Sequence, residues 1–211
     1  MCIRDRICPI AFENGELVQE VAQATYLGVA MAKNAKSDKE VEKRFKDARW
    51  AWYRLAEFWK KGALPLKTRL LIYTAFIMAK IVYALESLAI PDTLMAKLDT
   101  FHLRGLRQLL GMKTTFIKRA NTNARLLQKA NEQINALPPN APFRKRPRKQ
   151  TRIILVSEMI QERAAALLGE IIRAPPQQLM RQVTLLPGSA EPNYADTRRQ
   201  GRPKRSWLEL T

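Results

Sequence analysis

The residues that could do chemistry are few, and their spacing does not favour catalysis. His102 is the only histidine, and nothing in the sequence indicates the serine and aspartate that a catalytic triad would need beside it. A single histidine among leucines is more often packed or hydrogen-bonded than a metal ligand. Asp92 and Asp99 begin the same expected helix and are typical of a helix cap and a surface residue. Glu86 has no visible acid–base partner and predicts a structural hydrogen bond.

Metal and phosphate motifs are also missing from the sequence. The two cysteines, Cys2 and Cys8, support neither a disulfide framework nor a zinc knuckle. Tyr194-Ala195-Asp196 resembles half of a two-metal motif, but it lacks a second aspartate and strand-like neighbours, so we reject it as a metal site. The glycines are scattered and form no phosphate-cradling loop. We therefore predict no catalytic residue, metal site or cofactor in this chain.

Charge is the strongest global signal. The 211 residues contain 37 Lys and Arg against 19 Asp and Glu, which gives a formal charge of +18. Such a charge attracts polyanions, so nucleic acid is the first candidate partner and an anionic membrane surface the second. A solvated basic surface without a specific partner is the remaining interpretation. The apolar run from Leu70 to Ala84 contains Lys80, and the N-terminus lacks a signal-peptide core. We expect no membrane span and an intracellular protein, cytoplasmic or nuclear.

The cations expected to contact nucleic acid fall on the polar faces of two helices, in a linker and in the tail. They are Lys39, Lys43, Lys46, Arg54, Arg104, Arg107, Arg144, Lys145, Arg146, Arg148, Lys149, Arg198, Arg199, Arg202, Lys204 and Arg205. The linker cations can grip a phosphate backbone, act as a nuclear-import signal, or simply be solvated. The Gly-Arg-Pro tail predicts a flexible basic arm ending at Trp207.

The elements that carry these cations are mainly helical. Val41, Phe45, Ala48, Trp52, Leu55 and Trp59 recur at steps of four and three, which predicts a helix with one buried stripe. Ser37 and Glu40 have the spacing of a capping box at its start. Lys60, Lys61 and Gly62 are typical of its end.

Two further helices complete the expected bundle. The first begins near Pro65 and runs from Leu66 to about Leu88. It is apolar on nearly all sides, which predicts a central, buried position. The second follows Asp92 as N-cap and ends at Gly111.

Shorter elements are predicted downstream. Thr114-Thr115-Phe116 predicts a turn, and Asn121 or Thr122 caps a short helix that ends near Asn131. Residues 136–152 form a basic, proline-rich linker that we expect to be extended and mobile. Another helix runs from Ile153 to Arg173 and stops at Pro175-Pro176. Met180 to Leu186 predicts a short extended piece, followed by the irregular basic tail.

The N-terminal part predicts strands without a complete sheet. Residues 1–6 resemble a translated sequencing-adapter end and are set aside. Asn14-Gly15 predicts a tight hairpin turn between residues 12 and 18. Ala24 to Val29 predicts a second extended piece. Two or three short strands are not stable alone, so we expect a fragment of a longer protein.

Several blocks, taken in order, resemble the end of a non-LTR (LINE-like) retrotransposon reverse transcriptase. In that family a Tyr-Leu-Gly block closes the palm, and the helices after it form the thumb. The blocks are Tyr26-Leu27-Gly28-Val29, Leu66-Lys67-Thr68-Arg69, Tyr83-Ala84-Leu85-Glu86-Ser87, Phe101 to Gly111, Thr122-Asn123, Leu167-Leu168-Gly169, Ile171-Ile172-Arg173 and Gly201 to Trp207. Glu170 departs from the family, whose members often carry histidine after Leu-Leu-Gly.

The resemblance implies a domain order and a role. Residues 7–36 would be the palm edge, 37–135 the helical thumb, 136–152 the linker, and 153–211 the post-thumb helix and tail. The parent protein would be a Mg²⁺-dependent, RNA-directed DNA polymerase whose fingers, palm and catalytic aspartates lie upstream. This chain would hold the RNA and DNA of the template–primer duplex without chemistry of its own. Trp50 and Tyr53 would pack on the palm or stack on nucleic acid.

Two other interpretations stay open. The chain can be a stand-alone basic helical adaptor that binds RNA or a protein and has no polymerase ancestry. It can also be the product of a decayed element without a function. The genomic reading frame separates the polymerase fragment from the adaptor, because an aromatic-Ala-Asp-Asp block upstream and in frame supports the polymerase ancestry, and a promoter and start codon just before Ile7 support the adaptor.

Overall fold

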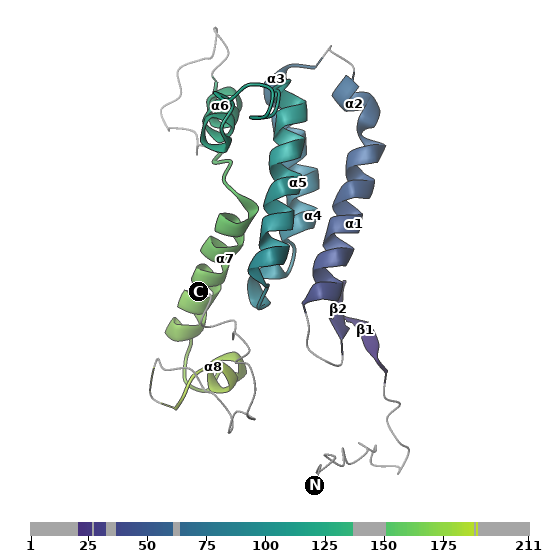
Figure 1. Ribbon diagram of the computed structural model, residues 1–211. Coiled ribbons are helices and arrows are strands. Elements are labelled where there is room, and N and C mark those ends of the chain that lie inside the picture. The colour runs from purple at the N-terminus through teal and green to yellow at the C-terminus, as the bar shows by residue number, and fades with distance from the viewer. Residues whose placement is uncertain are drawn as a thin grey trace.

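The computed structural model describes residues 21–26, 28–32, 37–60, 64–136, 151–187 and 189. The described chain is mainly helical and begins with a two-stranded hairpin, as the sequence predicts (Figure 1). Its elements are β1 (Gln23–Tyr26), β2 (Val29–Ala32), α1 (Asp38–Arg54), α2 (Ala56–Lys60), α3 (Leu66–Ile72), the π-helix η1 (Tyr73–Met78), α4 (Ala79–Val82), the 3₁₀ turn η2 (Leu85–Ser87), α5 (Asp92–Leu110), α6 (Asn123–Asn135), α7 (Val156–Arg173) and α8 (Leu179–Thr184).

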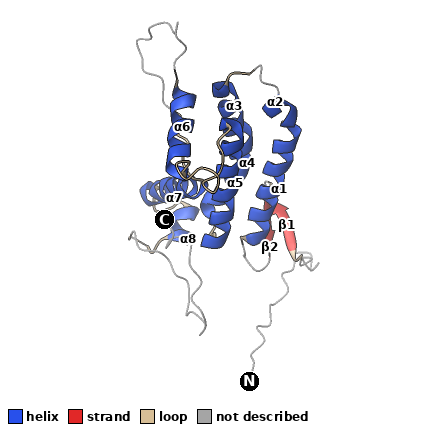
Figure 2. Ribbon diagram, turned by 45° about the horizontal axis from the view of Figure 1, so that its top comes forward, coloured by secondary structure: helices blue, strands red, loops and turns tan. Residues whose placement is uncertain are grey.

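The hairpin lies at the N-terminal end of α1 (Figure 2). β1 and β2 are antiparallel, and Tyr26 pairs with Val29, so two residues connect the strands. Gly28 has a φ angle of 81°, which a residue without a Cβ adopts most easily. The prediction of one extended piece from Ala24 to Val29 was therefore wrong, because the chain reverses inside it. The turn predicted at Asn14-Gly15 lies outside the described residues.

The predicted stripe of α1 and its N-cap position at Ser37 are confirmed, but the predicted capping box and the unbroken helix up to Lys60 are not. Val41, Ala48 and Trp59 are buried, and Phe45 and Trp52 pack against the core. The capping box was wrong, because the Ser37 hydroxyl donates to the carbonyl of Ala89 at 2.8 Å instead of capping its own helix. The helix also breaks at Leu55, so α1 ends at Arg54 and the short α2 continues the stripe.

The segment from α3 to α4 is the central one. Leu70, Tyr73, Ile77 and Ile81 have no exposed surface. By length and composition Leu66–Ser87 is long enough to cross a membrane, although we expected no such span from the sequence. The core helix of a soluble protein passes the same test, and this segment packs against α1, α5 and α6.

Burial of the central segment is one-sided rather than complete. Leu71, Phe76 and Tyr83 are exposed, which corrects the prediction of a segment buried on nearly all sides. The segment also does not form one continuous α-helix. It widens into the π-helix η1 and ends at Tyr83, whose φ and ψ angles are extended. The Thr74 hydroxyl donates to the carbonyl of Leu70 at 2.7 Å inside this segment, a contact that often bends helices.

Helix α5 packs beside the central segment, and both contact α7 (Figure 1). Its N-cap is Pro91, so the predicted cap, Asp92, is instead the first helical residue. Gly111 ends the helix with a φ angle of 62°, as predicted. The amide of Met112 then donates to the carbonyl of Arg107 at 2.9 Å, which completes a C-terminal capping motif.

Helices α6 and α7 each pack against both α5 and the central segment. Thr122 caps α6 by accepting a hydrogen bond from the amide of Arg125 at 3.3 Å, which settles the predicted choice between Asn121 and Thr122. Helix α6 ends at Asn135 rather than near Asn131. Two asparagine side chains of α6 bind the residues that precede α7. Asn131 forms hydrogen bonds with the backbone of Ile153, and Asn135 with that of Thr151. Thr151 is therefore fixed, although it was assigned to a mobile linker.

Two predictions at the C-terminal side need correction. Helix α7 begins at Val156, and the residues from Ile153 to Leu155 precede it in a non-helical conformation. Leu179–Thr184 forms the short helix α8, where an extended piece was predicted. The stop at Pro175 is confirmed, since α7 ends at Arg173.

Candidate nucleic-acid interface

A groove of about 660 Å³ runs between α1 and α5. Its walls include apolar side chains from both helices, among them Phe45 and Phe101, whose ring centroids are 5.0 Å apart. Lys46 and Arg104 also line it, one from each helix. The other charged lining residues are Arg49, Lys97 and Glu42, so the groove has four cations and one carboxylate.

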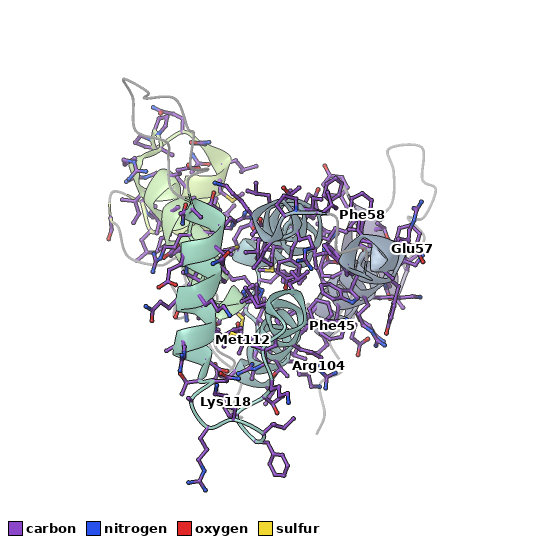
Figure 3. All side chains as sticks on the ribbon, turned by 90° about the horizontal axis from the view of Figure 1, so that it is seen from above. Phe45, Glu57, Phe58, Arg104, Met112 and Lys118 are labelled. Carbon is purple, nitrogen blue, oxygen red and sulfur yellow. The ribbon has the colours of Figure 1, made fainter. Side chains whose placement is uncertain are left out.

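Two further depressions adjoin this groove along α5. The first shares Thr100 and Arg104 with the groove and adds Arg107 and Lys113. The second shares Gly111, Met112 and Lys113 with the first and extends along α6. In Figure 3 the labelled Phe45, Arg104, Met112 and Lys118 lie together on one side of the molecule, apart from Glu57 and Phe58. The three depressions therefore form one continuous surface.

The charges on this surface are strongly unequal. We call its cations the basic track. They are Lys46, Arg49, Lys97, Arg104, Arg107, Lys113, Lys118, Arg125 and Lys129. Only two carboxylates, Glu42 and Glu132, line the same three depressions. Nine cations against two carboxylates in connected depressions give this surface a positive electrostatic potential, which attracts a polyanion.

Backbone hydrogen bonds fix the part of the track between α5 and α6. Asn121 is buried and donates from Nδ2 to the carbonyl of Lys113 at 2.9 Å. The amide of Asn121 donates to the carbonyl of Lys118 at 2.9 Å. Arg107 donates to the carbonyl of Asn121 at 3.2 Å and to the side chain of Asn123 at 2.8 Å. Arg107 therefore joins α5 to the start of α6, besides contributing a positive charge to the track.

The structure brings some of the predicted helix cations together and separates others. Lys46 and Arg104 line one groove, and Arg107 lines the next depression. Lys39 and Arg54 are exposed on α1 but line none of the three depressions. Lys43 donates to the carbonyl of Gly28 at 2.6 Å and so contacts the hairpin turn. The single basic face predicted for α1 is thus divided among three surroundings: the groove, the hairpin turn and the surface outside the depressions.

Ten of the predicted cations lie outside the described residues. These are the linker residues Arg144, Lys145, Arg146, Arg148 and Lys149, and the tail residues Arg198, Arg199, Arg202, Lys204 and Arg205. The rejected Tyr194-Ala195-Asp196 also lies there. Their proposed contacts with nucleic acid stay predictions.

Sequence reasoning missed six members of the track: Arg49, Lys97, Lys113, Lys118, Arg125 and Lys129. One signal was available, because Lys97 and Arg104 are seven residues apart and therefore share a face of α5. Arg125 and Lys129 likewise share a face of α6, since they are four residues apart, whereas the cations of the preceding loop give no such signal. Their approach to α5 depends on the path of residues 111–122, which local sequence does not determine.

Two buried polar side chains of the core, Tyr73 and His102, are suited to packing. The Tyr73 hydroxyl and His102 Nδ1 are 2.9 Å apart, and the two rings stack at a centroid distance of 5.7 Å. Burial lowers the pKa of His102 to about 4, although Asp99 and the backbone of Ile154 act in the opposite direction. Burial raises the pKa of Tyr73 above its usual value. His102 is therefore neutral at pH 7, and the prediction of a packed, hydrogen-bonded histidine is confirmed.

Within the described residues, no group of three or more His, Cys, Asp or Glu side chains is placed to hold a metal ion. Asp99, predicted as a surface residue, is half-buried and bonds to Ser157 on α7. The described surface can thus bind anions by charge. The buried Tyr73 and His102 and the half-buried Asp99 take part in packing and hydrogen bonding inside the bundle.

No protein-family model matches the chain, and neither a curated protein nor a solved structure is significantly similar to it. A helical domain with a continuous basic surface is therefore the class that the fold and the site define.

Proposed function

We propose that the basic track binds the sugar–phosphate backbone of a nucleic-acid duplex. The observation that carries the proposal is the run of nine cations, with two carboxylates, along three adjoining depressions. Lysine and arginine contacts to phosphates position a duplex and carry no base information directly. Binding is therefore expected to depend on charge and shape rather than on base sequence.

The dimensions of α5 suit this role. The stretch of α5 from Lys97 to Arg107 rises about 15 Å, nearly half of the roughly 34 Å of one turn of duplex. The track follows α5 from Lys97 to Arg107 and continues onto the loop and α6. Its cations can thus contact several phosphates of one bound duplex instead of a single anion.

The family resemblance gives such binding a purpose. We propose that the chain is the thumb and post-thumb part of a LINE-like reverse transcriptase and holds template–primer nucleic acid for that enzyme. Mg²⁺ and the catalytic aspartates would then belong to the palm of the parent protein. The chain itself would contribute positioning and no bond-breaking step.

A stand-alone adaptor is the second candidate, and exposed aromatic side chains fit it as well as they fit the first. Trp50 and Tyr53 are exposed on α1, away from the core, and the guanidinium carbon of Arg54 lies 4.6 Å from the Trp50 ring centroid. Neighbouring exposed aromatics mark surfaces that another protein or domain covers. That partner would be the palm in the first proposal and a separate protein in the second. An in-frame aromatic-Ala-Asp-Asp block upstream would support the palm.

The backbone-binding proposal is tested by the salt dependence of binding. Fluorescence anisotropy of a labelled RNA–DNA duplex is measured against the purified chain at several salt concentrations. Removing one cation that neutralises a phosphate should reduce the log–log slope by about 0.9. The Lys46→Gln/Arg104→Gln variant, changed inside the track, should therefore lower the slope by about 2.

The matched control is Lys39→Gln/Arg54→Gln, which removes the same charge from outside the three depressions. It should leave the slope nearly unchanged. Equal effects of the two variants would show that total charge, not the track, governs binding. Salt-independent binding would exclude phosphate contacts altogether, and DNA synthesis by the chain with Mg²⁺ would contradict the placement of the catalytic aspartates elsewhere.

A further inference from the structure

Phe116 is the most exposed large hydrophobic residue of the described chain, with 97% of its surface accessible. It lies in the loop between α5 and α6, and the adjacent Ile117 is 64% exposed. Three exposed cations, Lys113, Lys118 and Arg119, belong to the same loop. Full exposure of a phenylalanine forgoes the stabilisation that its burial would give, so an exposed ring among cations indicates a surface that meets a partner.

The loop holds Phe116 in a defined position. The amides of Ile117 and Lys118 both donate to the carbonyl of Thr114, at 3.1 and 3.0 Å. Asn121 anchors the base of the loop through the carbonyls of Lys113 and Lys118. These bonds fix the backbone that carries the ring, so binding through Phe116 does not have to order the loop.

Phe116 lies next to the basic track, although its own side chain lines none of the three depressions. Thr115 and Ile117, its neighbours on both sides, line the depression that contains Arg104 and Arg107. Lys118 lines the next depression with Arg125. A nucleic acid whose backbone follows the track would therefore pass the Phe116 ring.

We propose that Phe116 stacks on an unpaired base next to the duplex held in the track. This inference rests on the proposed function. Aromatic rings stack on every base, so the contact fits backbone binding without sequence preference. Flanking cations would hold the phosphates on either side of the stacked base. An anionic membrane also attracts apolar tips with cations, but the track extends from the tip along α5 and α6, which fits a long polyanion better.

The test uses a duplex with a single-stranded overhang whose first unpaired base is 2-aminopurine, whose fluorescence is quenched by stacking. The wild-type chain should quench it. Phe116→Ala should abolish the quenching and weaken binding by roughly tenfold to a hundredfold, with an unchanged salt slope and less than a twofold effect on a blunt duplex. Phe116→Trp should retain both signals.

Phe76→Ala is the matched control, since Phe76 is 58% exposed on η1 and, unlike Phe116, has no chain neighbour that lines any of the three depressions. It should behave as wild type, and circular dichroism checks that all variants fold. If Phe116→Ala bound and quenched like the wild type, the stacking contact would be overturned. Salt-dependent binding by the wild type would still support the basic track. An equal loss on blunt and overhang duplexes would overturn the assignment to an unpaired base. Loss of binding to phosphatidylserine vesicles alone would assign Phe116 to a membrane, and failure of the wild type to bind any nucleic acid would refute both proposals.

Discussion

The carboxylate of Asp99 on α5 caps the first turn of α7. Its Oδ1 accepts a hydrogen bond from the amide of Ser157 at 3.0 Å, and its Oδ2 accepts one from the Ser157 hydroxyl at 2.7 Å. The amides of a first helical turn have no partner inside the helix, and Leu155 at the N-cap provides no side-chain bond. A residue 58 positions away therefore supplies what the local sequence lacks, and it joins α7 to the bundle.

Replacing Asp99 by alanine should lower the free energy of unfolding by about 1–2 kcal/mol, because a helix loses both its cap and a favourable negative charge. Asp99→Asn keeps an acceptor oxygen and should cost less. Urea unfolding followed by circular dichroism measures both. In a double-mutant cycle with Ser157→Ala, strictly additive effects would show that the two side chains do not interact in solution.

The contact between Asp99 and Ser157 shows which features of the fold the local sequence does not predict. The stripe of α1 and the end of α5 at Gly111 follow from helical period and glycine geometry, and both were predictable. The roles of Ser37 and Asp99 were not, because their partners lie 52 and 58 residues away. A residue with good capping chemistry caps its own helix only when no better partner lies closer in space.

Two glycines inside helices should respond in opposite directions to substitution by alanine. A Cβ on Gly105 would lie 3.1 Å from the Tyr73 hydroxyl and 3.2 Å from the Tyr73 ring. Tyr73 is fully buried between Trp52 and His102, so it cannot move away easily. We expect Gly105→Ala to destabilise by about 1–3 kcal/mol through overpacking.

Gly169 in α7 is the matched comparison. A Cβ there would meet the guanidinium of Arg173 at 3.2 Å, the far end of a side chain that can rotate away. Gly169→Ala should therefore raise the free energy of unfolding by up to about 1 kcal/mol, the gain in helix propensity. Thermal unfolding of both variants provides the measurement. Stabilisation of both would mean that Tyr73 yields to the added methyl group.

Buried His102 should make stability depend on pH. Its pKa is about 4 in the folded chain and about 6.5 in the unfolded chain. Above pH 6.5 neither state binds the proton, and the full stability is present. Between pH 6.5 and 4 only the unfolded state binds it, so stability falls with falling pH by up to about 3 kcal/mol.

Other groups also titrate in this range, so the comparison is with His102→Asn, which keeps an acceptor for the Tyr73 hydroxyl and cannot titrate there. Urea unfolding at several pH values gives the two profiles. The wild type should have the steeper loss between pH 6.5 and 4. Parallel profiles would show that His102 is protonated as easily in the folded chain as in the unfolded one.

The candidate interface was less predictable than the fold. Arg104 could be placed on a polar helix face from its spacing alone, and so could Lys46. Their meeting in one groove depends on how closely α1 approaches α5, which is set by Phe45 and Phe101 in the contact. The contribution of Lys113 depends on the loop that Asn121 anchors. Such surfaces arise from tertiary packing, and helical period alone does not reveal them.

Glu40 attaches the hairpin to α1, and its replacement should lower the free energy of unfolding strongly. It is 1% exposed, and its Oε2 accepts from the amide of Ala30 at 2.5 Å while its Oε1 pairs with Arg44. Arg44 is buried too; it donates to the carbonyl of Gly28 at 2.8 Å and lies over the Tyr83 ring at 4.5 Å. Glu40→Ala would leave a buried guanidinium without its carboxylate, so we expect a loss of about 3–5 kcal/mol.

The double variant Glu40→Ala/Arg44→Met removes both charges and should be more stable than Glu40→Ala, since an apolar replacement of a buried pair is often well tolerated. Urea unfolding gives the free energies, and amide hydrogen exchange at Ala30 reports on the hairpin. Exchange should accelerate in both variants, because each lacks the acceptor for that amide. If the single and double variants were equally destabilised, the cost would come from the missing hydrogen bond to the hairpin and not from an uncompensated charge.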